Sequence, residues 1–193
     1  LQTMRVGIVT LGCDKNTVDN EYLSGLLSGR GIEVEVADED RPPDVVVITT
    51  CGFLQAAKDQ SVAEIRRWAK VREKSGTRLG VIGCMAQRHG DQLLRDIPQI
   101  DFLAGVGDFE RVANLVSGHG KSKFLTNTNG EAWELGVQSA SAVEALESPD
   151  SGIEFDNRQF NVGAPRVLVP RTLPRMRLDR RPHGFLKISD GCN

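Results

Sequence analysis

Short apolar runs alternate with longer amphipathic stretches over the first 116 residues of the chain. The apolar runs predict buried strands at residues 5–11, 33–37, 44–50, 79–82 and 102–106. The stretches between them predict helices that begin at Asn16 or Thr17, near residue 54, near residue 91 and after Asp108. Strands that alternate with helices indicate an open parallel sheet with helices on both faces. We therefore expect an α/β fold with the flavodoxin-like strand order 2-1-3-4-5.

The second of these helices has two possible starts. Its buried stripe of Val62, Ile65, Trp68 and Ala69 fits a helix over residues 54–74. Ser61 and Glu64 also match a capping box, so the helix could begin at Ser61 instead.

The pattern changes at about Gly118. Residues 118–164 are polar and have no sustained period, which is typical of a long, poorly ordered connection. Residues 166–181 are rich in Arg and Pro, and form either a solvated linker or a contact strip for an acidic or RNA-containing partner. Residues 185–189 predict the first strand of a new domain. We expect an N-terminal domain at 4–118, a linker at 119–182 and the start of a second domain at 183–193.

Composition narrows the function classes. The net charge of −2 argues against a dedicated nucleic-acid binder, because such proteins are usually strongly basic. No apolar run approaches the ~20 residues that span a bilayer, and the first residues do not resemble a signal segment. We therefore expect no membrane contact, a cytoplasmic location and a monomer.

The four cysteines carry the candidate chemistry. Cys13, Cys51, Cys84 and Cys192 each follow a predicted strand, and the carboxyl edge of a parallel sheet is where ligands bind. In the order 2-1-3-4-5, the strands before Cys13, Cys51 and Cys84 are neighbours, with a spacing of ~4.8 Å. Three thiolates would therefore meet over a width on the order of 10 Å, comparable to a four-iron cluster with its ligands. The alternative is that each cysteine is a small buried hydrophobic residue.

Soft thiolates select zinc, copper(I) or iron–sulfur clusters. Structural zinc usually takes four protein ligands, and His89 is the nearest candidate for the fourth. A four-iron cluster held by three cysteines would leave one iron open to an outside ligand. The spacing favours a cluster over zinc.

A non-catalytic module is the rival interpretation. It would be a flavodoxin-like or zinc-binding domain, although Gly105-Val106-Gly107 is too short to count as a dinucleotide-binding motif. No Ser-His-Asp or Cys-His nucleophile set is present, because none of the histidines (His89, His119 and His183) is next to a cysteine.

Four ordered motifs resemble those of the radical-SAM methylthiotransferase family. The first is Leu11-Gly12-Cys13-Asp14-Lys15-Asn16, followed by Val18-Asp19 and Glu21. The next two are Thr50-Cys51-Gly52-Phe53 and Gly83-Cys84, and Lys187-Ile-Ser-Asp-Gly-Cys192 resembles the start of the family's radical-SAM barrel. The match covers residues 5–115 and 177–193.

The resemblance implies two 4Fe-4S clusters. Cys13, Cys51 and Cys84 would hold an auxiliary cluster whose open iron carries the sulfur to be donated. Cys192 would be the first ligand of the cluster that cleaves S-adenosylmethionine. The chain stops one residue after Cys192, without the rest of that motif or of the barrel, so we expect a truncated protein that is inactive alone.

The resemblance also implies a substrate. Lys15-Asn16, Gly52-Phe53 and Ser189-Asp190-Gly191 are similar to the RimO-like branch, which adds a methylthio group to an aspartate β-carbon of small-subunit ribosomal protein S12. The alternative branch modifies an adenosine of tRNA. The expected partners are that ribosomal protein or the ribosome, and a small-molecule sulfur donor. Asp14, Lys15, Asn16, Asp19 and Glu21 either tune the cluster through hydrogen bonds or only cap and solvate the first helix.

Overall fold

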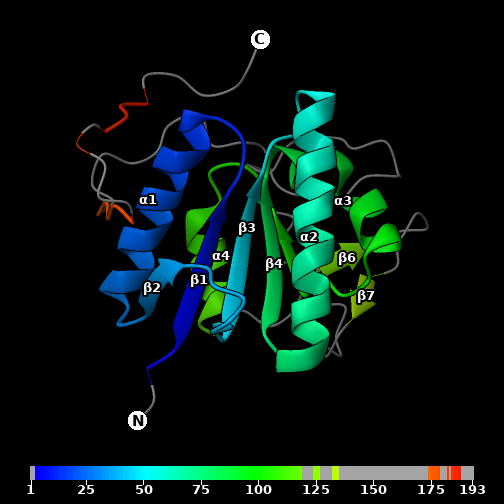
Figure 1. The fold of residues 1–193 in the computed structure, drawn as a ribbon, viewed down its shortest axis with the longest axis horizontal. Coiled ribbons are helices and arrows are strands. Elements are labelled where there is room, and N and C mark those ends of the chain that lie inside the picture. The colour runs from blue at the N-terminus through cyan, green and yellow to red at the C-terminus, as the bar shows by residue number, and fades with distance from the viewer. Residues whose placement is uncertain are drawn as a thin grey trace.

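A computed structural model describes residues 3–118, 124–126, 132–134, 174–178, 182 and 184–187. Its centre is a five-stranded parallel sheet with the order β2-β1-β3-β4-β5. The strands are β1 (Arg5–Thr10), β2 (Glu33–Val36), β3 (Val45–Thr50), β4 (Arg78–Gly83) and β5 (Phe102–Ala104). The predicted α/β class and strand order are confirmed (Figure 1).

Helices cover both faces of this sheet. They are α1 (Asp14–Gly29), α2 (Gln55–Ser75), α3 (Cys84–Asp96) and α4 (Phe109–Val116). One core joins α1 and α4 to one face of the sheet, and a second core joins α2 and α3 to the other (Figure 1). Among the described residues, no helix is both long and apolar enough to cross a membrane.

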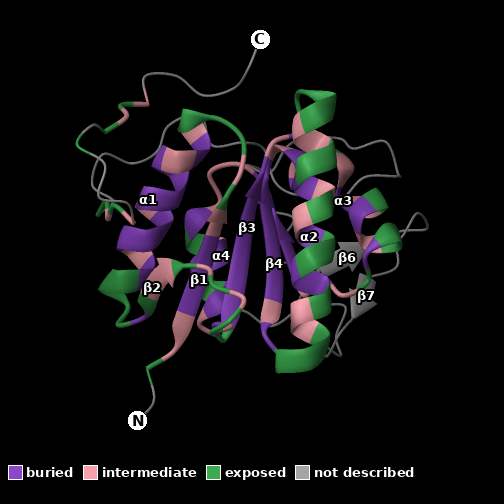
Figure 2. Ribbon diagram, in the orientation of Figure 1, coloured by how far each residue is buried: buried purple, intermediate pink, exposed green. Residues whose placement is uncertain are grey.

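The central strand β3 belongs to both cores. All six of its residues are buried, because successive side chains point to opposite faces and each face carries a helix (Figure 2). Val45 and Val47 face α1 and α4, whereas Val46 and Ile48 face α2 and α3. A shift of β3 would therefore disturb the packing on both faces of the sheet.

Two helix starts differ from the prediction, whereas α2 begins at Gln55, close to the predicted residue 54. The first helix begins at Asp14, and Cys13 rather than Asn16 or Thr17 occupies the N-cap position. The helix α3 begins at Cys84, seven residues before the predicted start, and its backbone leaves the helical region at His89. The capping-box alternative for α2 is wrong, because Ser61 lies inside the helix and its Oγ donates to the Ala57 carbonyl at 2.8 Å.

Part of the polar stretch after Gly118 forms a hairpin. The strands β6 (Phe124–Thr126) and β7 (Ala132–Glu134) pair antiparallel, with Leu125 opposite Trp133. The sequence between them contains Asn129-Gly130, a strong hairpin signal that the polar composition obscured.

The predicted second domain is only partly visible. Residues 184–187, the described part of the predicted strand, are not in a strand, and no other described strand pairs with them. The Arg-rich segment was expected to be either solvated or available to a partner, but residues 174–178 lie beside α1 (orange in Figure 1). Cys192, His119 and His183 lie outside the described residues, as do four of the arginines, Arg166, Arg171, Arg180 and Arg181.

Replacement of Gly80 by Ala should destabilise the sheet. A Cβ built on Gly80 would lie 2.1 Å from Cζ of Phe102 on the neighbouring strand, and that ring is itself buried. We expect the free energy of unfolding in urea to fall by about 1–3 kcal/mol. Gly29→Ala is the control, because a Cβ there meets nothing within 4 Å. Equal stability of the two variants would contradict this account of the β4–β5 packing.

Candidate functional site

The parallel register brings three cysteines to one edge of the sheet. Thr10 of β1 pairs with Thr49 of β3, and Thr50 pairs with Gly83 of β4. Cys51 and Cys84 follow this last pair directly, and Cys13 lies three residues beyond Thr10. We call the loops that carry Cys13, Cys51 and Cys84 the rim, and the structure places all three at the carboxyl ends of adjacent strands, as the sequence predicted.

Glycines allow the rim loops to lie in direct contact. A Cβ on Gly12 would lie 2.8 Å from the Cβ of Cys51, and one on Gly52 would lie 3.0 Å from the carbonyl oxygen of Cys84. Gly83 has a φ of +96°, and a Cβ there would lie 2.8 Å from the carbonyl oxygen of Thr50. A side chain at any of these three glycines would therefore crowd a neighbouring loop or strand end.

The cysteine side chains are accessible. Cys13 is exposed, Cys51 and Cys84 are half-buried, and none of the three is in a disulfide. The alternative that each is a buried hydrophobic residue is therefore wrong. The helix α1 starts directly after Cys13, whose carbonyl accepts hydrogen bonds from the Asn16 amide at 2.9 Å and the Thr17 amide at 3.4 Å.

The structure gives no support to a compact zinc site. In the part of the chain that the structure describes, no group of three or more His, Cys, Asp or Glu side chains is arranged to hold a metal ion. His89 lies at the break in α3, where burial, and then the charges of Lys58 and Arg88, hold its pKa below the ordinary value. What the rim offers is three thiols spread along three strand ends.

Asn16 ties the first rim loop to the second. Its side chain is buried, and its Nδ2 donates to the Leu11 carbonyl at 2.7 Å and to the Thr50 carbonyl at 3.3 Å. Thr50 continues the link, because its Oγ1 donates to the Ile82 carbonyl at 2.7 Å. The expectation that Asn16 caps or solvates the helix is wrong: it is an internal brace between strand ends.

A second buried amide lies one helical turn further along α1. Asn20 Nδ2 donates to Thr10 Oγ1 at 2.7 Å, and Asn20 Oδ1 accepts a hydrogen bond from Thr49 Oγ1. Sequence analysis did not find Asn20, Thr10 or Thr49. The available signal was the i, i+4 spacing of two asparagines, which places them on one face of the helix.

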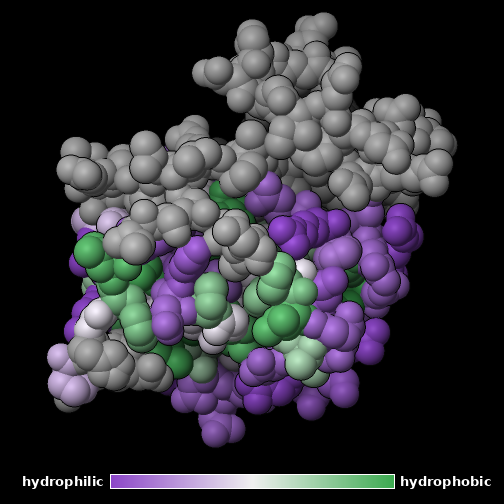
Figure 3. Space-filling view, turned by 90° about the horizontal axis from the view of Figure 1, so that it is seen from above, coloured by the Kyte–Doolittle hydropathy of each residue, from purple (hydrophilic) through white to green (hydrophobic). Residues whose placement is uncertain are grey.

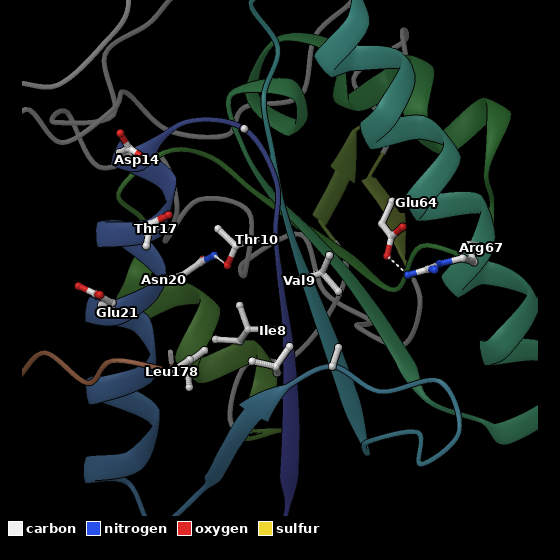
Figure 4. Close-up of a pocket in the computed structure, with 13 residues that line it drawn as sticks. Ile8, Val9, Thr10, Asp14, Thr17, Asn20, Glu21, Glu64, Arg67 and Leu178 are labelled. Atoms are coloured by element: carbon white, nitrogen blue, oxygen red, sulfur yellow. Dashed lines mark hydrogen bonds and ion pairs between the residues drawn. The ribbon is translucent and has the colours of Figure 1, made fainter. Parts of the chain in front are cut away.

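A cavity of about 530 Å³ opens beside the first rim loop (Figure 4). It lies between α1 and α2, above the ends of β1 and β2, and Gly12 and Asp14 form part of its wall. In Figure 4, Asp14, Thr17 and Glu21 come from α1, and Glu64 pairs with Arg67 on α2. The first rim loop is thus open on this side.

Two large apolar side chains just after the second cysteine are exposed. Phe53 is 49% exposed and Leu54 is 61% exposed, directly after Cys51-Gly52. Figure 3 looks onto this end of the molecule and shows hydrophobic and hydrophilic residues side by side.

Curated relatives match nearly the whole chain. The chain is 32% identical over 193 residues to a protein of Desulforudis audaxviator and 35% identical over 189 residues to one of Acetivibrio thermocellus. These alignments cover 100% and 98% of this chain, but only 35% of each relative. Both relatives are named "Ribosomal protein uS12 methylthiotransferase RimO". The chain thus spans about a third of the length of the curated relatives it matches.

A family model described as "Uncharacterized protein family UPF0004" matches residues 5–105. These residues contain β1 to β5 and all three rim cysteines. The resemblance to the RimO-like branch, which the motifs indicated, is confirmed by the relatives. The chain therefore belongs to the UPF0004 family, and its sequence is similar to the RimO-like methylthiotransferases.

Proposed function

We propose that this chain is the cluster-holding part of a methylthiotransferase that acts on ribosomal protein uS12. The observation that supports the proposal is the placement of Cys13, Cys51 and Cys84 just after the ends of three adjacent strands. The names of the relatives supply the substrate. No observation favours the tRNA branch.

The donor set suits an iron–sulfur cluster. The three rim side chains are thiols, the ligand type that such clusters use. Neighbouring strands are ~4.8 Å apart, so the three loops span a width that fits a cluster better than a single ion. Gly12, Gly52 and Gly83 let the three loops approach one another closely, since a Cβ at each would crowd a neighbouring loop or strand end.

In the family that this chain resembles, the auxiliary cluster supplies the sulfur that is transferred to the substrate. The role of the protein is to hold its three ligands and leave one side open. Asn16 and Thr50 fix the loops beneath the sulfur atoms, and the cavity beside Gly12 and Asp14 leaves a path to the first loop. A small-molecule sulfur donor would enter by such a path.

The rest of the activity belongs to residues beyond this domain. We propose that Cys192 is the first ligand of a second 4Fe-4S cluster, which acts with S-adenosylmethionine. The exposed Phe53 and Leu54 would be covered by the domain that carries that cluster or by the ribosomal substrate. Action on a ribosomal protein also implies a cytoplasmic location.

Loss of the three rim thiols should abolish iron binding. After anaerobic addition of iron and sulfide, the wild-type chain should become brown and retain about four iron atoms. The combined variant Cys13→Ser, Cys51→Ser and Cys84→Ser should stay colourless, because serine does not replace a soft thiolate ligand. Iron analysis and visible absorption measure the difference.

Cys192→Ser is the matched control for this experiment. It removes one thiol from the chain but none from the rim, so it should retain the iron and the colour. Iron retained by the triple variant would overturn the proposal. Stoichiometric zinc with no iron uptake in the wild type would favour a zinc-binding module instead.

Asn16→Asp should weaken the rim without a change in side-chain size. The carboxylate cannot donate to the Leu11 and Thr50 carbonyls, and its charge would be buried. We expect the free energy of unfolding to fall by about 1–3 kcal/mol, with less iron retained after reconstitution. Asn114→Asp, at an exposed site on α4, should change neither quantity. Unaltered stability of Asn16→Asp would contradict the bracing role.

A further inference from the structure

A distant part of the chain is seated along α1. We call residues 174–178 and 184–187 the strap. The Met176 amide donates to the Glu21 carbonyl at 2.9 Å, and Leu178 packs against the core beneath α1 and α4. Leu178 and Glu21 both line the cavity drawn in Figure 4. The strap therefore adds both a backbone hydrogen bond and an apolar contact to this helix.

A glycine of α1 fits the strap closely. A Cβ built on Gly25 would lie 2.3 Å from the carbonyl oxygen of Pro174 and 2.9 Å from the amide nitrogen of Arg175. The three nearest atoms to this position all belong to the strap. Glycine in a helix interior is unfavourable by itself, so its presence here is explained by the approach of another backbone.

Glu21 is buried and paired with strap arginines. Its carboxylate accepts a hydrogen bond from Arg175, and Arg177 Nε lies 3.8 Å from its Oε1. Arg175 also donates to the Phe185 carbonyl at 2.6 Å, and its guanidinium lies 5.9 Å from the centre of the Tyr22 ring. One arginine thus joins both parts of the strap to α1.

Asp19 forms the second charged contact. Lys187 Nζ lies 2.7 Å from Asp19 Oδ1, and the two side chains are only 8% and 9% exposed. Asp19 belongs to the first cysteine motif, and Lys187 begins the motif that ends in Cys192. Two motifs 168 residues apart are therefore joined by a buried ion pair.

We infer that α1 is an intramolecular docking site, in which Asp19, Glu21 and Gly25 are positioning residues that hold the strap. Buried carboxylates are costly unless cations pair with them, and in the docked arrangement Arg175 pairs with Glu21 and Lys187 pairs with Asp19. Neither a solvated linker nor a strip reserved for an external acidic partner fits these contacts.

Docking limits where the next residues can lie. Cys192 comes five residues after Lys187, so it can be at most ~18 Å from that residue along an extended chain. Asp19, the partner of Lys187, is on the same helix that begins after Cys13. The docking of the strap is independent of the proposed function. Any role of Cys192 in sulfur transfer rests on that proposed function.

Gly25→Ala should release the strap from an otherwise intact domain. Alanine favours the helix, but its methyl group would clash with the strap backbone. In the cluster-free chain, we expect the Met176 amide to exchange with deuterium about tenfold faster or more, and trypsin to cut faster after Arg175 and Arg177. The thermal midpoint of the domain should be unchanged or higher, which a merely structural role for Gly25 would not give.

Gly29→Ala is the matched control on the same helix, and it should leave strap exchange as in the wild type. Glu21→Gln provides an independent test, since it keeps the size and the backbone hydrogen bond but removes the ion pairs with both arginines. We expect intermediate, salt-insensitive strap protection in this variant and salt-sensitive protection in the wild type.

Wild-type strap exchange as fast as that of Gly25→Ala would overturn the inference. So would equal protection in Gly25→Ala and Gly29→Ala. These measurements need no iron, so they separate the two proposals. Iron uptake without protection of the strap amides would contradict the docking inference alone. Protection of the strap amides without iron uptake would contradict the proposed function alone.

Discussion

The hydrogen-bond register between β1, β3 and β4 is the constraint on which the rest of the structure depends. It sets the height at which each strand ends, and so the relative positions of the three loops that follow. Because β3 is buried on both faces, its end cannot shift without disturbance of two cores. The three cysteines of the rim, which are far apart in the sequence, are therefore positioned by β3, which is buried on both faces, and by the strands next to it.

Helix α1 connects this rim to the remainder of the chain. Its first turn follows Cys13, its inner face carries Asn16 and Asn20 to the strand ends, and its outer flank receives the strap. The Cys13 carbonyl accepts hydrogen bonds from the first turn of α1, the Asn16 and Asn20 side-chain amides donate to the strand ends, and ion pairs join α1 to the strap. A single rigid helix thus relates the rim to residues near the end of the chain.

The sequence was most informative where the decisive pattern is local. Alternation of strands and helices predicted the sheet order, and the position of each cysteine after a strand predicted the rim. The early start of α3 was missed, because Gly83-Cys84 continues an apolar run and hides the helix boundary. The hairpin at 124–134 was missed because a short turn signal lies in a polar stretch.

What could not be predicted depends on partners that are distant in sequence. Asn16 braces a residue 34 positions away, and Glu21 and Asp19 meet cations 154 and 168 positions away. Taken alone, each of these polar residues looks like an ordinary solvated position on a helix, and no periodicity reveals that it is buried. Only the folded arrangement distinguishes an internal brace from a surface residue.

The contacts of the strap extend the folded unit beyond its last sheet-packing helix. The helices that pack on the parallel sheet end with α4, at Val116, but a buried ion pair joins Lys187 to α1. A shortened protein that ends near residue 118 would retain the sheet and yet present Asp19, Glu21 and the apolar ground under Leu178 to water. Such a piece would leave Asp19 and Glu21 without the strap cations that pair with them, so a basic segment of another molecule could bind to α1 in place of the strap.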